Sequence, residues 1–206
     1  MFFCHQRGIL WVMKDKAAVW TVFLVALCVL GLYGLKQWGS RVKARSEAQA
    51  LSQASQWGSL PHMAARQMIE EYGPPQLIFA DRLVWTEQRP WKRISVLDSS
   101  SAPLEQAVSY AGPVSRLREP VRLPHGAVAS AGQRELVARS NSEELNRLCL
   151  NLADDIAKGK RSRAEAWRFY LRTVELTVAG KSSPYMRRLL FEVPEPEIPR
   201  RPLAHF

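Results

Sequence analysis

The chain has 206 residues, of which 47% are hydrophobic and 23% are charged, and its formal net charge is +10. This composition excludes an intrinsically disordered chain, because such chains carry too little apolar surface to fold, and it leaves room for one globular domain. The excess of arginine and lysine favours an anionic partner such as lipid headgroups, nucleic acid or an acidic protein, without choosing among them.

An apolar stretch near the N-terminus, Ala17 to Leu35, contains nineteen residues and no charge. A helix of that length rises by about 28 Å, which is close to the thickness of the hydrocarbon core of a bilayer. We therefore expect residues 17–38 to form one transmembrane anchor that follows a flank at residues 1–16. Aromatic residues that favour the membrane interface lie near the ends of the span, at Trp20, Tyr33 and Trp38.

The alternative to a retained anchor is a cleaved signal peptide. The apolar run exceeds the 7–15 residues of a typical signal sequence, and no small-residue cleavage site follows it directly, so we favour the anchor. Basic residues that could contact anionic headgroups follow the span, at Lys36, Arg41, Lys43 and Arg45. By the positive-inside rule they favour a cytoplasmic domain, more so if translation starts at Met13. A short N-terminal tail that stays inside would instead send the domain to the periplasm.

The folded domain is expected at residues 59–192. The preceding segment, residues 39–58, is rich in Ala, Gln, Ser and Arg, which predicts a polar linker or a helical extension of the anchor. A first helix is predicted to end at Gly73, which two prolines follow. Its apolar face has helical spacing and consists of Ala65, Met68, Ile69 and Tyr72.

A small antiparallel sheet is predicted by short segments with alternating apolar residues. These segments are residues 77–79, 82–86, 91–96, 105–110 and 135–139. A turn at residues 88–90 should join the second and third segments into a hairpin, with Trp85 and Trp91 near its closed end. Residues 111–124 contain three prolines and one glycine, which indicates a connecting loop.

Two helices over about residues 143–179 are predicted to form an antiparallel hairpin, because their connection is too short for any other arrangement. Capping-box patterns that begin at Ser140 and Ser162 mark the helix starts, and Gly159 and Gly180 mark the ends. The apolar face of the second helix is expected to contain Trp167, Tyr170, Leu171, Val174 and Val178. The tail at residues 193–206 has four prolines and is expected to be a loose terminus or an extended docking segment.

No residue pattern predicts a catalytic, cofactor or metal site. The Gly180-Lys181-Ser182 sequence resembles the end of a phosphate-binding loop but follows a helix and lacks the earlier glycine. The four histidines lack metal-ligand neighbours, and Cys149, alone in the expected domain, can form no disulfide within it. Asp154 and Asp155 could act as bases or bind a cation. We favour a solvated helix face for them, with Asp154 paired to Lys158 four residues later.

One cluster of aromatic and basic residues is a candidate interaction surface. It consists of Trp85, Trp91, Lys92 and Arg93. Such rings beside cations can stack on a nucleotide base or contact a partner protein. The simpler interpretation, which we favour, is packing within the hairpin, with the two cations covering the rings.

Four segments resemble an uncharacterised group of small bacterial proteins with no known activity. They are YGPP at residues 72–75, RLVW at 82–85, PWKR at 90–93, and NLADDI at 151–156 followed by Gly159-Lys160. The resemblance covers roughly residues 63–190 and leaves the anchor outside. It implies a bacterial source and one small α+β domain, and it carries no activity.

These observations predict an α+β domain held at the inner membrane by a single span. The favoured function is a non-catalytic accessory role in which the domain meets a protein partner at the membrane surface. The alternative is a membrane-tethered binder of nucleic acid or nucleotide, through the basic surface around Trp91. An enzyme whose site is assembled from scattered residues also stays open.

Overall fold

A computed structural model of the chain describes residues 41–99, 101–132 and 134–195. The chain divides into two compact units, residues 1–46 and residues 47–206, and the α+β domain belongs to the second. The predicted anchor at residues 17–38 lies outside the described residues and stays a prediction. Within the described ranges, no helix combines the length and the apolar character needed to cross a bilayer.

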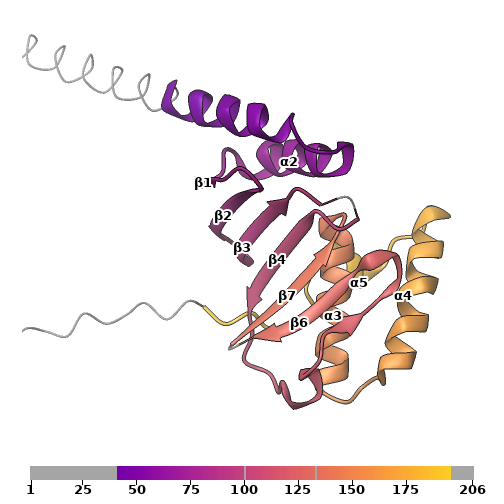
Figure 1. The fold of residues 1–206 in the computed structure, drawn as a ribbon. Helices are drawn as coiled ribbons and strands as arrows, with labels where there is room; N and C mark the ends of the chain where they lie inside the picture. Colours follow the sequence, from indigo (N-terminus) through magenta and orange to yellow (C-terminus); the bar gives the residue numbers. More distant parts are fainter. Residues whose placement is uncertain (1–40, 100, 133, 196–206) are drawn as a thin grey trace, which may run out of the picture. The chain divides into compact units, whose positions relative to one another are not determined.

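The domain contains a seven-stranded antiparallel sheet with helices, which confirms the predicted α+β class (Figure 1). The strand order is β1-β2-β3-β4-β7-β6-β5. The strands are β1 (Leu77–Ile78), β2 (Arg82–Gln88), β3 (Trp91–Leu97), β4 (Leu104–Ser109), β5 (Val121–Arg122), β6 (Val128–Gly132) and β7 (Glu135–Ser140). The helices are α2 (Ser59–Tyr72), α3 (Glu143–Ala157), α4 (Arg163–Val178) and α5 (Pro184–Arg187), with short 3-10 turns η1 (Ser115–Leu117) and η2 (Pro124–Gly126).

The domain begins earlier than residue 59, the boundary predicted from the sequence. Residues 41–54 are helical, and Ala50 and Ala54 are fully buried in the core of the domain. Trp57 follows them into the core and donates a hydrogen bond from its indole nitrogen to the Ala80 carbonyl, at 3.0 Å. The residues that attach this helix to the core are mostly alanines, which give a weak apolar signal, so the sequence predicted a polar linker or a helical extension. Of these two alternatives, residues 41–54 form the helix.

Helix α2 and the β2–β3 hairpin form as predicted. Ala65, Met68 and Ile69 are buried on one face of α2, and Gly73 follows its last turn with a positive φ of 75°. In the hairpin, Leu83 pairs with Val96 and Trp85 pairs with Ile94, and all four side chains are buried. The alternation of apolar residues therefore predicted the hairpin and its buried face, and the pairing of the two strands is set by the fold.

The last predicted strand, β7, lies inside the sheet between β4 and β6. After β4 the chain crosses to the far edge as β5, returns as β6, and then inserts β7 against β4. Neither β5 nor β6 is predicted from the sequence, which placed a connecting loop over the first of them. The β6 segment reads Val-Ala-Ser-Ala-Gly, and small residues of this kind carry little β-strand signal.

Helices α3 and α4 form the predicted hairpin and run in opposite directions beside the sheet in Figure 1. The second capping box is confirmed, because Ser162 and Glu165 each bond the backbone of the other. The first is wrong: Ser142 is the N-cap of α3, and its side chain accepts from the Leu145 amide. The hydroxyl of Ser140 instead donates to the side chain of Asn146, at 2.7 Å.

Candidate functional site

Helix α3 is buried around its whole circumference in its second half, where every residue from Leu148 to Ala157 is buried. It packs against β4, β6 and β7 of the sheet, and against α4 and α5. A helix enclosed in this way leaves its polar side chains without water. They must therefore find partners within the protein.

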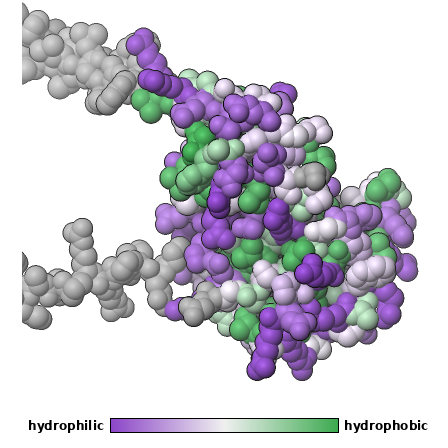
Figure 2. All heavy atoms as spheres, in the orientation of Figure 1, coloured by the Kyte–Doolittle hydropathy of each residue, from purple (hydrophilic) through white to green (hydrophobic). Residues whose placement is uncertain are grey.

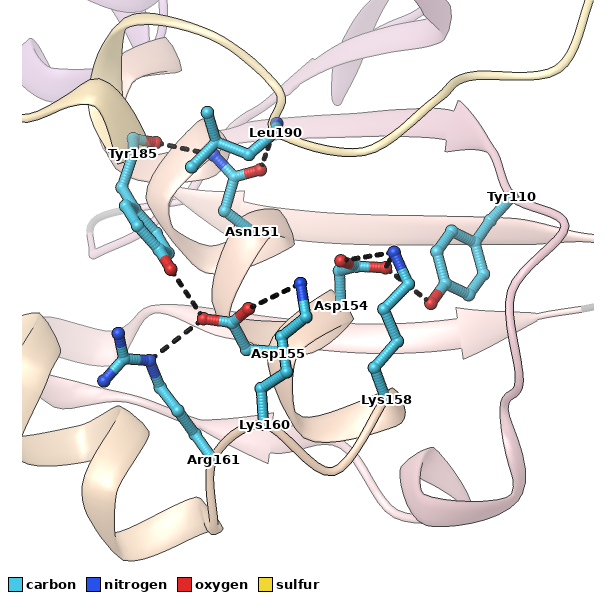
Figure 3. Close-up of polar contacts among 9 residues, drawn as sticks. All are labelled: Tyr110, Asn151, Asp154, Asp155, Lys158, Lys160, Arg161, Tyr185 and Leu190. Carbon is cyan, nitrogen blue, oxygen red and sulfur yellow. Dashed lines mark hydrogen bonds and ion pairs between the residues drawn. The ribbon is translucent and has the colours of Figure 1, made fainter.

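Asp154 and Asp155, in the last turn of α3, are 4% and 5% exposed, so the predicted solvated helix face is wrong. Figure 3 shows the residues that surround them. The carboxylate of Asp154 accepts a hydrogen bond from the Tyr110 hydroxyl, at 2.9 Å, and pairs with Lys158, at 2.8 Å. The predicted pairing of Asp154 with Lys158 is confirmed.

The carboxylate of Asp155 has its own set of partners. It accepts a hydrogen bond from the Tyr185 hydroxyl, at 2.8 Å, and another from Nε of Arg161, at 2.9 Å. Lys160 adds an ion pair at 3.9 Å. The Arg161 guanidinium also lies over the Phe169 ring, 4.2 Å from its centroid, so α4 contributes to the same cluster.

Carboxylates at the C-terminal end of a helix face the negative end of its dipole, which disfavours their charge. Here the unfavourable helix dipole at each carboxylate is offset by a hydrogen bond from a tyrosine hydroxyl and by at least one cation. Because both carboxylates are engaged by side chains of the protein, the cluster is suited to holding elements together rather than to transferring protons. No group of three or more His, Cys, Asp or Glu side chains among the described residues could hold a metal ion.

Asn151, one turn earlier on α3, binds the C-terminal segment through its side-chain amide. The amide nitrogen donates to the carbonyls of Tyr185 and Arg188, at 2.9 and 2.8 Å. The amide oxygen accepts from the Leu190 backbone N–H, at 2.7 Å. Together with the Tyr185 hydroxyl on Asp155, these bonds fasten α5 and the residues after it to α3 (Figure 3).

This cluster predicts a loss of stability at alkaline pH. Burial, and then the hydrogen bond to Asp154, raises the pKa of Tyr110, and burial raises the pKa of Tyr185. An unfolded tyrosine loses its proton near pH 10, so above about that pH the unfolded state binds fewer protons than the folded state. Their contribution is therefore fully present below that pH. Above it, we expect the free energy of unfolding to fall by up to about 1.4 kcal/mol per pH unit for each tyrosine.

Urea denaturation across about pH 9 to 11 measures this dependence. Replacement of Tyr110 by phenylalanine should make the alkaline fall shallower, because one of the shifted groups is gone. An unchanged slope in that variant would contradict the assignment.

A second buried carboxylate, Glu143, lies at the start of α3. It accepts hydrogen bonds from the Tyr72 hydroxyl, at 2.9 Å, and from the Gln106 amide, at 2.8 Å, and it pairs with Arg147. The network extends to Trp91, whose indole nitrogen donates to the Tyr72 hydroxyl at 3.1 Å. Glu143 therefore joins α2, the sheet and α3.

A cavity of about 280 Å³ opens beside Arg147, between α3, α4 and the segment that carries α5. Its lining consists of Glu144, Arg147, Thr177, Ser182, Ser183, Met186 and Arg187. Two guanidinium groups and a carboxylate share this lining, so it does not select one sign of charge. The cavity therefore favours no particular class of ligand.

The fold buries the two tryptophans of the candidate hairpin surface and leaves its two cations at the surface. Trp85 and Trp91 are 0% and 1% exposed, so neither ring is available to a base or to a partner. Their indole nitrogens bond the Gly73 carbonyl and the Tyr72 hydroxyl, which explains why the core tolerates them. Lys92 is exposed and pairs with Glu135 of β7, while Arg93 is half-buried and pairs with Glu105 of the neighbouring strand β4.

The predicted membrane contacts fall into two groups. Arg41, Lys43 and Arg45 are exposed on the helix at residues 41–54. The remaining cation and the predicted interface aromatics lie outside the described residues, and they are Lys36, Trp20, Tyr33 and Trp38.

Helix α4 exposes apolar side chains that we expected to be buried. Ala166, Tyr170 and Thr173 form its buried face, while Trp167 is 46% and Val178 is 86% exposed. The predicted face is therefore wrong in part: Tyr170 is buried as expected, but Ala166 and Thr173 complete the buried face in place of Trp167 and Val178. Hydrophobic residues reach the surface on the α4 side of the domain in Figure 2.

No family model, curated protein or solved structure compared with this chain matches it.

Proposed function

We propose that the protein is a membrane-anchored accessory protein that acts by binding another protein chain and has no catalytic role. The observation that carries the proposal is the apolar stripe of α4, which we define as Trp167, Leu171, Val174 and Val178. Trp167 and Val178 are exposed and Leu171 and Val174 between them are half-buried, and an apolar helix face left in part uncovered is typical of a protein interface.

Attachment to the membrane rests on the sequence of residues 17–38 and on the cations that follow. Arg41, Lys43 and Arg45 are exposed, as contact with anionic headgroups requires. The buried carboxylates support a non-catalytic role, since each is engaged by partners of its own.

The alternative, a binder of nucleic acid or nucleotide, has less support. It depended on the rings of Trp85 and Trp91, which are buried, and on Lys92 and Arg93, which are ion-paired. The apolar stripe on α4 contains no positive charge that could pair with a phosphate backbone. We therefore favour a protein as the partner.

Photocrosslinking of the full-length protein in its native membrane tests the proposal. With p-benzoylphenylalanine in place of Val178, we expect a light-dependent adduct with a protein, because this side chain is 86% exposed on the stripe. The same probe in place of Arg172, an exposed residue outside the stripe, is the matched control and should give none. Absence of an adduct at position 178, or release of the protein by alkaline carbonate, would contradict the proposal.

A further inference from the structure

The apolar stripe of α4 has the spacing of a coiled-coil seam. Its members, Trp167, Leu171, Val174 and Val178, are separated by four, three and four residues. Separations that alternate between four and three residues, as in a heptad repeat, keep one side of a helix facing a second helix. Trp167 and Val178 at its ends are exposed. Leu171 and Val174 between them are half-buried, and Val174 also packs against the core of its own domain. The stripe therefore has the form of half an interface between two helices.

We infer that a second copy of this chain covers the stripe, with the two α4 helices antiparallel about a twofold axis. The inference rests on the proposed function and names its partner. Placing the axis level with the middle of the stripe sets Trp167 opposite Val178 of the second copy, and Leu171 opposite Val174. Each large residue then faces a smaller one, which allows the two stripes to interdigitate.

Charge complementarity favours this arrangement over others. Arg168 and Glu175 each follow a member of the stripe directly, so they lie along the same edge of it. Antiparallel pairing brings like edges together and sets Arg168 of one copy opposite Glu175 of the other, twice in each dimer. Both side chains are exposed, and the Arg168 charge also acts on Glu165 one turn earlier on the same helix.

A parallel pair would lose this match. It would set the edge with Arg168 and Glu175 against the opposite edge of the partner helix, which carries Tyr170 and Thr177. Those two residues have no charge, and Tyr170 is buried in its own domain. The antiparallel arrangement is therefore the one in which both charges find a partner.

Charge reversal in the full-length protein tests the inference, with the Val178 photocrosslink as the readout. The expected adduct has twice the chain mass of 23.4 kDa. Arg168→Glu and Glu175→Arg should each lower its yield about tenfold or more, because each change turns two attractive contacts into two repulsive ones. Arg172→Glu, which reverses an exposed charge outside the stripe, is the control and should leave the yield unchanged.

Co-expression of the two charge-reversed variants, each with a different affinity tag, is the decisive experiment. A mixed dimer of Arg168→Glu with Glu175→Arg restores two attractive contacts. The adduct should therefore return between two chains that carry different tags, but not between two chains that carry the same tag. Failure to return, with both variants folded by circular dichroism, would overturn the inference. An adduct at the mass of one chain would also overturn it, since a segment of the same chain would then cover the stripe.

The outcomes separate the inference from the proposed function. An adduct with a different protein would overturn the second copy as partner and would leave the interaction role intact. No adduct of any mass would contradict both.

Discussion

Replacement of Glu143 by alanine is expected to lower the free energy of unfolding by about 3–5 kcal/mol, because it breaks a buried ion pair and leaves its partners behind. The carboxylate is 2% exposed and receives the Tyr72 hydroxyl, the Gln106 amide and the Arg147 guanidinium. Its removal leaves the fully buried Gln106 amide without this acceptor and Arg147 without its counter-charge. Urea denaturation followed by tryptophan fluorescence measures the loss, and it also reports on Trp91 at the end of the network.

The adjacent acid provides a matched control. Glu144 lies in the same first turn of α3, and therefore in the same favourable helix dipole, but its side chain is exposed. Its replacement by alanine should cost less than about 1 kcal/mol. Equal losses in the two variants would show that the buried network contributes nothing of its own.

Replacement of Asn151 by alanine is expected to release the C-terminal segment from α3. Two carbonyls and one N–H of residues 185–190 lose their partner, at an expected cost of about 2–3 kcal/mol. Because a loss of 2 kcal/mol changes an opening equilibrium by about 30-fold, trypsin cleavage after Arg188 should accelerate by at least roughly that factor. The time course of limited proteolysis, read by mass spectrometry, measures the acceleration.

Asn141 provides the control for this experiment. It is exposed before the N-cap of α3, and its replacement by alanine should leave cleavage after Arg188 unchanged. If Asn151→Ala were cleaved no faster than the Asn141 control, Asp155 and packing alone would hold the segment.

The polar residues of the candidate site recur at helical spacing, but this spacing alone does not tell a solvated helix face from a buried one. Glu143, Arg147 and Asp154 lie on α3 at spacings that return to one side of a helix, and a polar side of an amphipathic helix normally faces water. Here the sheet, α2 and the C-terminal segment cover that side. The positions of those elements depend on contacts between residues far apart in the chain, so the same pattern fits a solvated face and a buried network.

Local patterns by themselves determined α2, the β2–β3 hairpin, and the α3–α4 hairpin, because side-chain periodicity and the glycines at helix ends act within a few residues. Only the tertiary structure decided that β7 lies between β4 and β6, that Asp154 and Asp155 are buried, and that α4 turns Trp167 to solvent. Each of these outcomes depends on which surfaces meet. That choice is made by the packing of the whole domain, in which Tyr170 enters the core while Trp167, three residues earlier on the same helix, does not.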